Sequence, residues 1–151
     1  MEKKYEMTDE TIEVGGKTLH RIRALRDFGR VKKGDVGGFI EKEDNLSHDG
    51  NCWVGDDAKV YGYAKVFGDA HVYGYAEVYG NSRIYGKAEV FDEPCIYGHA
   101  EVYGEAYIYD RARVYGNAHV YGHAKIYGDA CVCWDDWIND DRRISTKEKN
   151  R

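Results

Sequence analysis

Residues 71–86 read HVYGYAEVYGNSRIYG, and in this stretch a tyrosine and a glycine follow each aliphatic residue. The aliphatic residues stand six positions apart, and the same spacing continues on both sides. It covers fourteen positions, each occupied by Val or Ile: 54, 60, 66, 72, 78, 84, 90, 96, 102, 108, 114, 120, 126 and 132. So regular a pattern indicates that one local design is repeated through most of the chain.

The positions beside the aliphatic residue are regular too. Two residues before it stands alanine in eleven of the last thirteen units, with Ser82 and Pro94 in the other two. Tyr or Phe follows it in all twelve units from Val60 to Ile126, and glycine comes next except at Asp92 and Asp110. This alternation predicts a short strand whose small and aliphatic residues face one way. Glycine predicts a corner, because it adopts positive φ without steric cost.

Such strands could form either a series of hairpins or a solenoid. Gly-Asn and Gly-Asp pairs also make tight antiparallel turns. Hairpins that reverse every six residues, however, leave strands of about four residues, which are too short for a sheet with its own core. A solenoid instead stacks each unit on the one a full coil later and builds a continuous core. The spacing therefore favours a solenoid.

The repeat resembles the hexapeptide motif of left-handed parallel β-helices, in which three units close one triangular coil. This resemblance implies an all-β fold with four to five coils over residues 54–134. Residues 18 apart then lie above one another, so the rings form three columns on the outside of the coils. The columns are Tyr61, Tyr79, Tyr97 and Tyr115; Phe67, Tyr85, Tyr103 and Tyr121; and Tyr73, Phe91, Tyr109 and Tyr127.

The chain is accordingly divided into three parts: an N-terminal β-hairpin and capping segment (1–50), the left-handed β-helix (51–134), and a short C-terminal cap and flexible tail (135–151). The hairpin is predicted around Gly15-Gly16. The open ends of a solenoid need covering, and Trp134 and Trp137 are predicted to cover the last coil.

Composition limits the classes of function. The chain has 151 residues and a net charge of −5, which disfavours binding to duplex nucleic acid. It contains neither an apolar stretch of about 18 residues nor the apolar core of a signal peptide, so a cytoplasmic protein without membrane contact is expected. The four cysteines are expected to be reduced thiols. Neither a metal site nor a cofactor is expected, since Cys131 and Cys133 supply only two ligands.

Three aromatic faces would expose much apolar surface on a monomer, so a homo-oligomer is expected. The resemblance implies a trimer.

Many hexapeptide-repeat proteins are acyltransferases that use a histidine as general base in a cleft between subunits, framed by a loop inserted into a coil. This chain offers four histidines on the repeat, at positions 71, 99, 119 and 123. The six-residue spacing never breaks, so no inserted loop is predicted. Other relatives are zinc carbonic anhydrases, but His119 and His123 do not have the spacing of their metal triad. No catalytic residue is therefore assigned.

Binding remains as the predicted role. Rings beside cations hold nucleobases and phosphates, and the chain resembles small β-helical proteins of bacterial and prophage genomes. We predict a non-catalytic homo-oligomeric module that binds a small anionic, nucleotide-type signal or a host protein. An acyltransferase and a self-assembling structural solenoid are the alternatives. The predicted ligand-binding residues are Arg21, Arg23, Arg26, Arg30, Lys65, Arg83, Tyr85, Tyr103, His119 and Tyr121.

Overall fold

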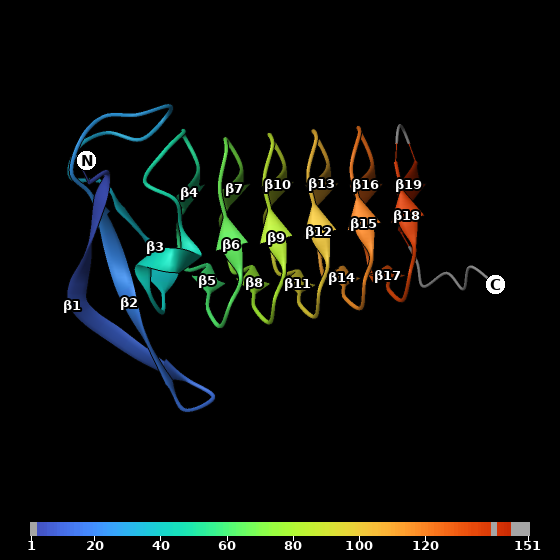
Figure 1. Ribbon diagram of the computed structural model, residues 1–151, viewed down its shortest axis with the longest axis horizontal. Helices are drawn as coiled ribbons and strands as arrows, with labels where there is room; N and C mark the ends of the chain where they lie inside the picture. Colours follow the sequence, from blue (N-terminus) through green and yellow to red (C-terminus); the bar gives the residue numbers. More distant parts are fainter. Residues whose placement is uncertain (1–2, 140–141, 146–151) are drawn as a thin grey trace.

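The computed structural model describes residues 3–139 and 142–145, and it is a parallel β-solenoid with an antiparallel cap at its N-terminal end (Figure 1). The predicted all-β solenoid is confirmed. No α-helix occurs in the described part of the chain, and one short 3-10 helix, η1 (Glu43–Asn45), lies before the regular coils.

Each coil contributes one two-residue strand to each of three parallel faces. The first face consists of β5 (Lys59–Val60), β8 (Glu77–Val78), β11 (Cys95–Ile96), β14 (Arg113–Val114) and β17 (Cys131–Val132). The second face consists of β6 (Lys65–Val66), β9 (Arg83–Ile84), β12 (Glu101–Val102), β15 (His119–Val120) and β18 (Trp137–Ile138). The third face consists of β4 (Trp53–Val54), β7 (His71–Val72), β10 (Glu89–Val90), β13 (Tyr107–Ile108), β16 (Lys125–Ile126) and β19 (Arg143–Ile144).

Strand pairing joins residues that are 18 positions apart. Val90, for example, lies in register with Val72 on one side and Ile108 on the other. The inward Val and Ile side chains of the coils are buried, and so are the alanines two positions before them. The core is thus a thin column of alanine and branched aliphatic residues, as the alternation predicts.

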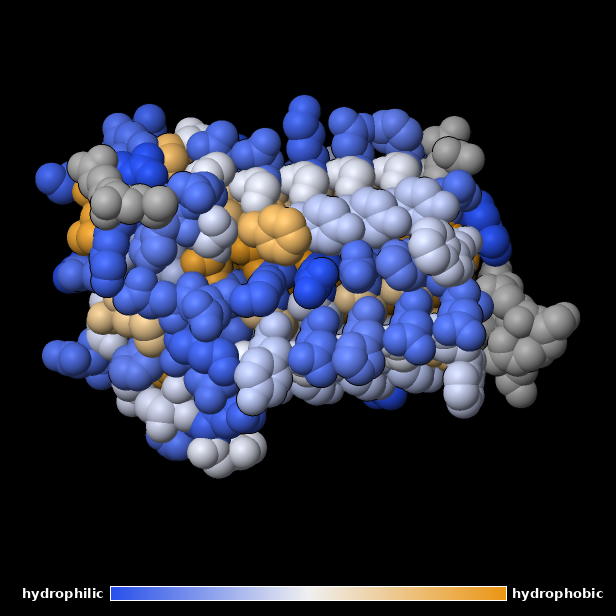
Figure 2. Space-filling model, viewed as in Figure 1, coloured by the Kyte–Doolittle hydropathy of each residue, from blue (hydrophilic) through white to orange (hydrophobic). Residues whose placement is uncertain are grey.

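The outer rings form the three predicted columns. Successive centroids lie 5.0–5.1 Å apart on the first face, 4.7–5.0 Å on the second and 5.1–5.2 Å on the third, with nearly parallel planes. The space-filling view shows such side chains as rows along the long axis of the solenoid (Figure 2). Because each ring faces the next one, stacking adds to the backbone ladders that join the coils.

The backbone conformation at the corners explains why glycine recurs there. Gly116 has a φ of 68°, and an added Cβ would lie 2.6 Å from the backbone nitrogen of Trp134 in the next coil. Asp92 and Asp110 occupy equivalent corners at φ 67° and 58°. The Asp110 carboxylate accepts a hydrogen bond of 2.8 Å from the Gly128 backbone N–H of the next coil. Aspartate at a corner therefore adds a link between coils that glycine lacks.

The N-terminal cap begins with the predicted hairpin. Strands β1 (Tyr5–Val14) and β2 (Lys17–Ala24) are antiparallel and turn at Gly15-Gly16, and β2 pairs antiparallel with β3 (Val36–Ile40). Strand β3 then pairs parallel with β5 and so starts the first face of the solenoid.

The solenoid is longer than predicted. The third face has six strands, so the chain makes about six coils rather than four to five. The added strands at the far end are β18 and β19, whose residues Ile138 and Ile144 are buried. Trp134 and Trp137 do not cover the core, because they are 68% and 58% exposed on the outside. That prediction is wrong. Of the predicted C-terminal cap and tail (135–151), residues 140–141 and 146–151 lie outside the described residues.

Within the described ranges, no helix has the length and apolar character needed to cross a membrane.

Candidate functional site

The second face brings together six of the residues predicted from the sequence to bind a ligand. Lys65, Arg83 and His119 lie on its strands, and Tyr85, Tyr103 and Tyr121 stack in its ring column. The Tyr85 hydroxyl donates a hydrogen bond of 2.8 Å to Glu101. Since the ring faces in this column are stacked against one another, they are not free to hold a nucleobase. The nucleotide-type ligand gains no support from this geometry.

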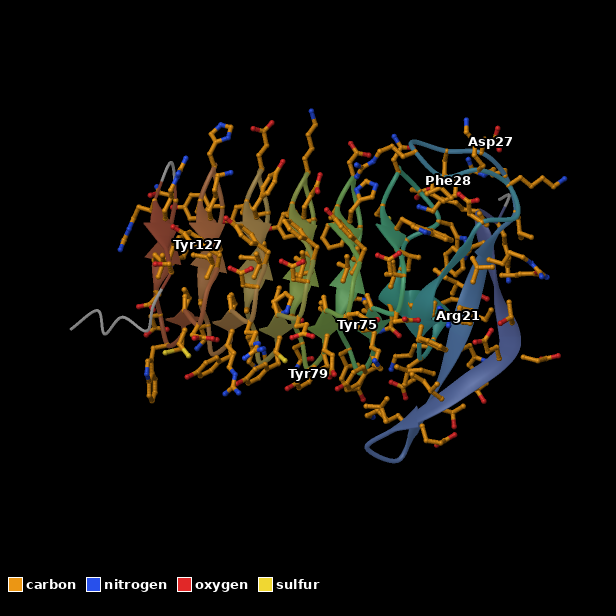
Figure 3. All side chains as sticks on the ribbon, turned by 180° about the vertical axis from the view of Figure 1, so that it is seen from behind. Arg21, Asp27, Phe28, Tyr75, Tyr79 and Tyr127 are labelled. Carbon is orange, nitrogen blue, oxygen red and sulfur yellow. The ribbon has the colours of Figure 1, made fainter. Side chains whose placement is uncertain are left out.

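The four cap arginines lie on β2 and in the loop that follows it, not on that face. Arg21 donates to the Asp56 carbonyl oxygen at 2.9 Å and lies over the Phe39 ring at 4.2 Å. Arg23 forms an ion pair with Glu6 on the neighbouring strand. Figure 3 shows Arg21 on the cap strands, far from the turn that contains Phe28. These two arginines tie the cap together.

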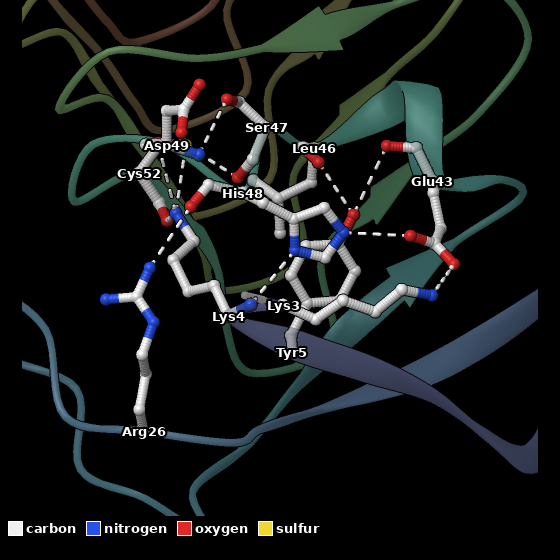
Figure 4. Close-up of polar contacts among 10 residues, drawn as sticks. All are labelled: Lys3, Lys4, Tyr5, Arg26, Glu43, Leu46, Ser47, His48, Asp49 and Cys52. Atoms are coloured by element: carbon white, nitrogen blue, oxygen red, sulfur yellow. Dashed lines mark hydrogen bonds and ion pairs between the residues drawn. The ribbon is translucent and has the colours of Figure 1, made fainter. Parts of the chain in front are cut away.

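Arg26 belongs to a polar cluster that joins the N-terminal residues to the start of the coils (Figure 4). Its guanidinium donates to the His48 carbonyl oxygen at 3.4 Å. Nearby, the buried Lys4 ammonium donates to the Cys52 carbonyl oxygen at 2.8 Å and lies 3.4 Å from the Cys52 sulfur. Burial lowers the pKa of Lys4. With several partners for one buried ammonium, the cluster fixes the cap to the coils.

Arg30 lies at the tip of a tight turn. The backbones of Phe28 and Val31 exchange hydrogen bonds of 2.9 and 2.7 Å across Gly29, which has a φ of 48°, and Arg30. Phe28 and Val31 are buried, and the Phe28 ring packs edge-on against Trp53 at 5.4 Å. The turn is thereby anchored on both sides of its tip. Figure 3 shows Phe28 in the loop beside the first coil.

This turn borders a groove of about 450 Å³ on the third face. Its walls include Arg30, Asp35, Trp53, Asp56, His71 and Tyr73. The volume lies in the range of small-molecule sites. A larger hollow of about 540 Å³ lies along the corners at Asp92 and Asp110, but each of these carboxylates already binds a backbone N–H of the next coil.

His71 is the chemically distinctive group in the third-face groove. Its Nδ1 lies 3.0 Å from the Asp69 carbonyl oxygen, which only accepts, so Nδ1 carries the proton. Nε2 is then the basic nitrogen, and it is buried without a hydrogen-bond partner among the residues that the structure describes. Burial lowers the pKa of the imidazole, and the Arg30 guanidinium lowers it further. His71 is therefore a neutral base at pH 7.

Tyr73 and Glu89 complete the surroundings of His71. The Tyr73 hydroxyl donates to Glu89 at 2.9 Å, and the Arg30 guanidinium lies 3.8 Å from the same carboxylate. Burial and the bond to Glu89 raise the pKa of Tyr73, which keeps the phenol protonated. The groove thus places a cation, a neutral base and a phenol on adjoining elements.

In the part of the chain that the structure describes, no three His, Cys, Asp or Glu side chains gather as a metal site would require. Cys131 lies on β17, and Cys133 follows it at the end of the first-face ring column, beside Tyr115.

Of the residues that line this groove, the sequence predicts Arg30 as a binding residue and names His71 only as one of four histidines on the repeat. Nothing in the repeat distinguishes His71 from the other three. Its environment depends on the cap turn, whose docking on β4 and β7 is a contact outside the six-residue spacing. Phe28 and Val31, the buried apolar residues of the turn, lie outside the repeat and give no local signal of that docking.

Comparison with known proteins gives limited matches. Residues 106–122 match the model of the YdcK beta solenoid repeat. A 51-residue segment is 41% identical to a protein of Escherichia coli (strain K12) named "Uncharacterized acetyltransferase YdcK". The matched segment covers 33% of this chain and 16% of that protein. The chain is therefore similar, over part of its solenoid, to a YdcK-type solenoid.

Proposed function

We propose that this chain is an acyltransferase in which His71 is the general base. The observation that carries the proposal is the unpartnered Nε2 of a neutral histidine beside a groove. The partial similarity to a protein named as an acetyltransferase supports the same class of reaction. The sequence alone gives an acyltransferase only as an alternative, because it predicts no inserted loop to frame the site.

The cap turn can frame the site in place of an inserted loop. In this chain the segment that frames the groove comes from residues 28–31 of the cap and does not interrupt any coil. The six-residue spacing can therefore stay unbroken while the groove still has a wall opposite the strands.

The proposed reaction uses His71 twice. Nε2 takes a proton from the acceptor nucleophile as the nucleophile attacks the carbonyl carbon of an activated acyl donor. The tetrahedral intermediate then collapses, and the imidazolium returns the proton to the leaving group. The bond from Nδ1 to the Asp69 carbonyl holds the ring in the tautomer that this step requires.

The test uses acetyl-CoA with a panel of amine and hydroxyl acceptors. We expect His71→Gln to lower kcat/KM by about 10²–10⁴-fold, the usual contribution of a general base. His123→Gln is the matched control, since His123 is an exposed repeat histidine paired with Glu105 at 3.0 Å. Equal activity of the two variants, with circular dichroism unchanged, would contradict the proposal.

A binding module without turnover is the second candidate. It is favoured by the burial of His71 Nε2, because a general base must be reached by the acceptor, whereas a ligand can bind Arg30 and Asp56 of the groove without touching this atom. Calorimetric binding without product formation would select this candidate. The homotrimer stays a prediction, to be measured by light scattering during size-exclusion chromatography.

A further inference from the structure

We propose that the acceptor bound in the third-face groove is a zwitterion of amino-acid size, with its carboxylate on Arg30 and its amino group facing Asp35 and Asp56. The inference rests on the proposed acyl transfer and names its substrate class. It is carried by the distribution of charge around the groove, which has a cation on the cap turn and carboxylates beside it.

Arg30 is available to a ligand. Its contact with Glu89 is long, at 3.8 Å, and the Arg30 side chain is 68% exposed. Exposed ion pairs of this kind hold their partners weakly. A ligand carboxylate can accept two parallel hydrogen bonds from one guanidinium and so replaces Glu89 with better geometry. The backbone of the turn stays fixed by Phe28 and Val31 during this exchange.

The carboxylates of Asp35 and Asp56 are each held in place by a backbone N–H. One oxygen of Asp35 accepts from the Lys32 backbone N–H at 2.9 Å, and one oxygen of Asp56 accepts from the Gly74 backbone N–H at 3.0 Å. Each carboxylate keeps a second oxygen and its negative charge. An ammonium group has three N–H donors, so it can donate to both carboxylates at once.

The step that follows is N-acylation. The ammonium gives a proton to solvent, and the resulting amine attacks the acyl carbon while His71 Nε2 takes its second proton. The C–N bond forms, the bond from the acyl carbon to the leaving thiolate breaks, and the thiolate takes the proton from His71. A thioester and an amino acid thus give an N-acyl amino acid and a free thiol.

The experiment compares matched acceptors that differ in the carboxylate. L-Serine, L-leucine and L-phenylalanine are each paired with the amine that lacks it: ethanolamine, isoamylamine and phenethylamine. With acetyl-CoA as donor, we expect kcat/KM to be at least about tenfold higher for the amino acid of each pair, which is the discrimination that one charged hydrogen-bonded pair supplies.

Arg30→Met is expected to abolish this preference, because it keeps the length of the side chain and removes the charge. The control is Arg111→Met, since Arg111 is an exposed arginine with a similar contact, 3.6 Å from Glu93. Equal kcat/KM for each amino acid and its paired amine would overturn this inference. It would not contradict the proposed acyltransferase activity.

A binding measurement distinguishes failure of the proposed acyl transfer from failure of the proposed zwitterion recognition. If none of the six acceptors is acetylated, the proposed function fails, and calorimetric titration with L-phenylalanine and phenethylamine then decides the recognition alone. Binding of the amino acid that Arg30→Met removes would support the zwitterion site. Equal affinity for both compounds, or no binding of either, would overturn it.

Discussion

At the scale of single residues, His71 couples folding to pH. The folded chain disfavours the charged imidazole, because burial and Arg30 lower its pKa below the ordinary value of about 6.5. Asp69 and Glu89 act in the opposite direction but do not outweigh burial. The unfolded chain therefore binds a proton more readily than the folded chain as the pH falls.

This coupling predicts a pH-dependent stability difference. The His71 contribution is present above about pH 6.5 and is lost as the pH falls through the lowered pKa of the folded state. We expect wild type to lose more stability than His71→Gln between pH 7.5 and 5.5. Thermal unfolding of both proteins at each pH measures the difference, and parallel curves would contradict it.

The same pKa sets the expected activity profile. With a hydroxyl acceptor, whose own ionisation lies far above neutral pH, a base that is neutral at pH 7 gives a kcat/KM that rises with pH below about pH 6.5 and stays constant through neutral pH. A rise centred above pH 7 would be incompatible with His71 as the base.

Trp134 is a second residue whose own conformation affects the stability of the folded chain. It occupies a corner that holds glycine in most other coils, and its φ is 58° although its side chain is bulky. The left-handed region costs a residue with a Cβ about 1–2 kcal/mol. The ring is 68% exposed, so little packing offsets this cost.

Replacing Trp134 by glycine is therefore expected to stabilise the chain. The gain is about 0.5–1 kcal/mol, after allowing for the greater freedom of glycine in the unfolded state. Urea unfolding measures it, and Trp134→Ala is the control because it removes the ring and keeps the Cβ. A larger gain for alanine than for glycine would show that the backbone is not the cause.

At the scale of elements, the ring columns hold neighbouring coils together. Tyr97 lies between Tyr79 at 5.1 Å and Tyr115 at 5.0 Å, whereas Tyr127 stacks on Tyr109 at 5.2 Å at the end of its column. A stacked pair contributes about 0.5–1.5 kcal/mol beyond the burial of area.

Tyr97→Leu is accordingly expected to cost about 1–3 kcal/mol, and Tyr127→Leu about half as much. Leucine keeps an apolar side chain at each position, so the comparison isolates the stacking. Urea unfolding of the two variants measures the difference. Equal losses would mean that the number of stacked neighbours does not matter.

Most of the fold follows from the sequence, because one spacing determines the strands, the buried face and the ring columns together. The last coil was missed because Ile138 and Ile144 keep only the aliphatic spacing. Asp136 and Arg142 stand where alanine precedes the other aliphatic residues. The backbone still pairs there, as the bond of 2.8 Å from the His119 N–H to the Asp136 carbonyl oxygen shows.

The candidate site could be predicted only in part. The sequence predicts Arg30 as a binding residue from its charge, but the position of Arg30 beside His71 depends on how the cap packs on the third face. That packing rests on the buried contacts of Phe28 and Val31, which lie outside the repeat. The sequence predicts the second-face residues as a site from their rings and cations. The ring columns that the spacing also predicts explain why those rings stack on one another.

At the scale of the whole molecule, the coils are interchangeable. Residues 91–108 form one complete coil, and joining residue 90 to 109 brings together residues of the same face. The groove lies earlier, at Arg30, His71 and Tyr73.

Deletion of residues 91–108 should leave a shorter solenoid with an intact groove. Deletion of residues 91–107 should unfold the far part, because a shift of one residue turns its buried side chains outward. Circular dichroism and thermal unfolding distinguish the two variants. Similar unfolding temperatures for both would contradict the equivalence of the coils.

The uniform ladder between coils has a mechanical consequence. Each coil is held to the next by the same backbone bonds on the same three sides, so a force that pulls the ends apart meets similar resistance at every level. Peeling one coil releases 18 residues, which correspond to roughly 60 Å of extended chain. Under tension the molecule should therefore lengthen in steps of equal size, one step for each coil that is released.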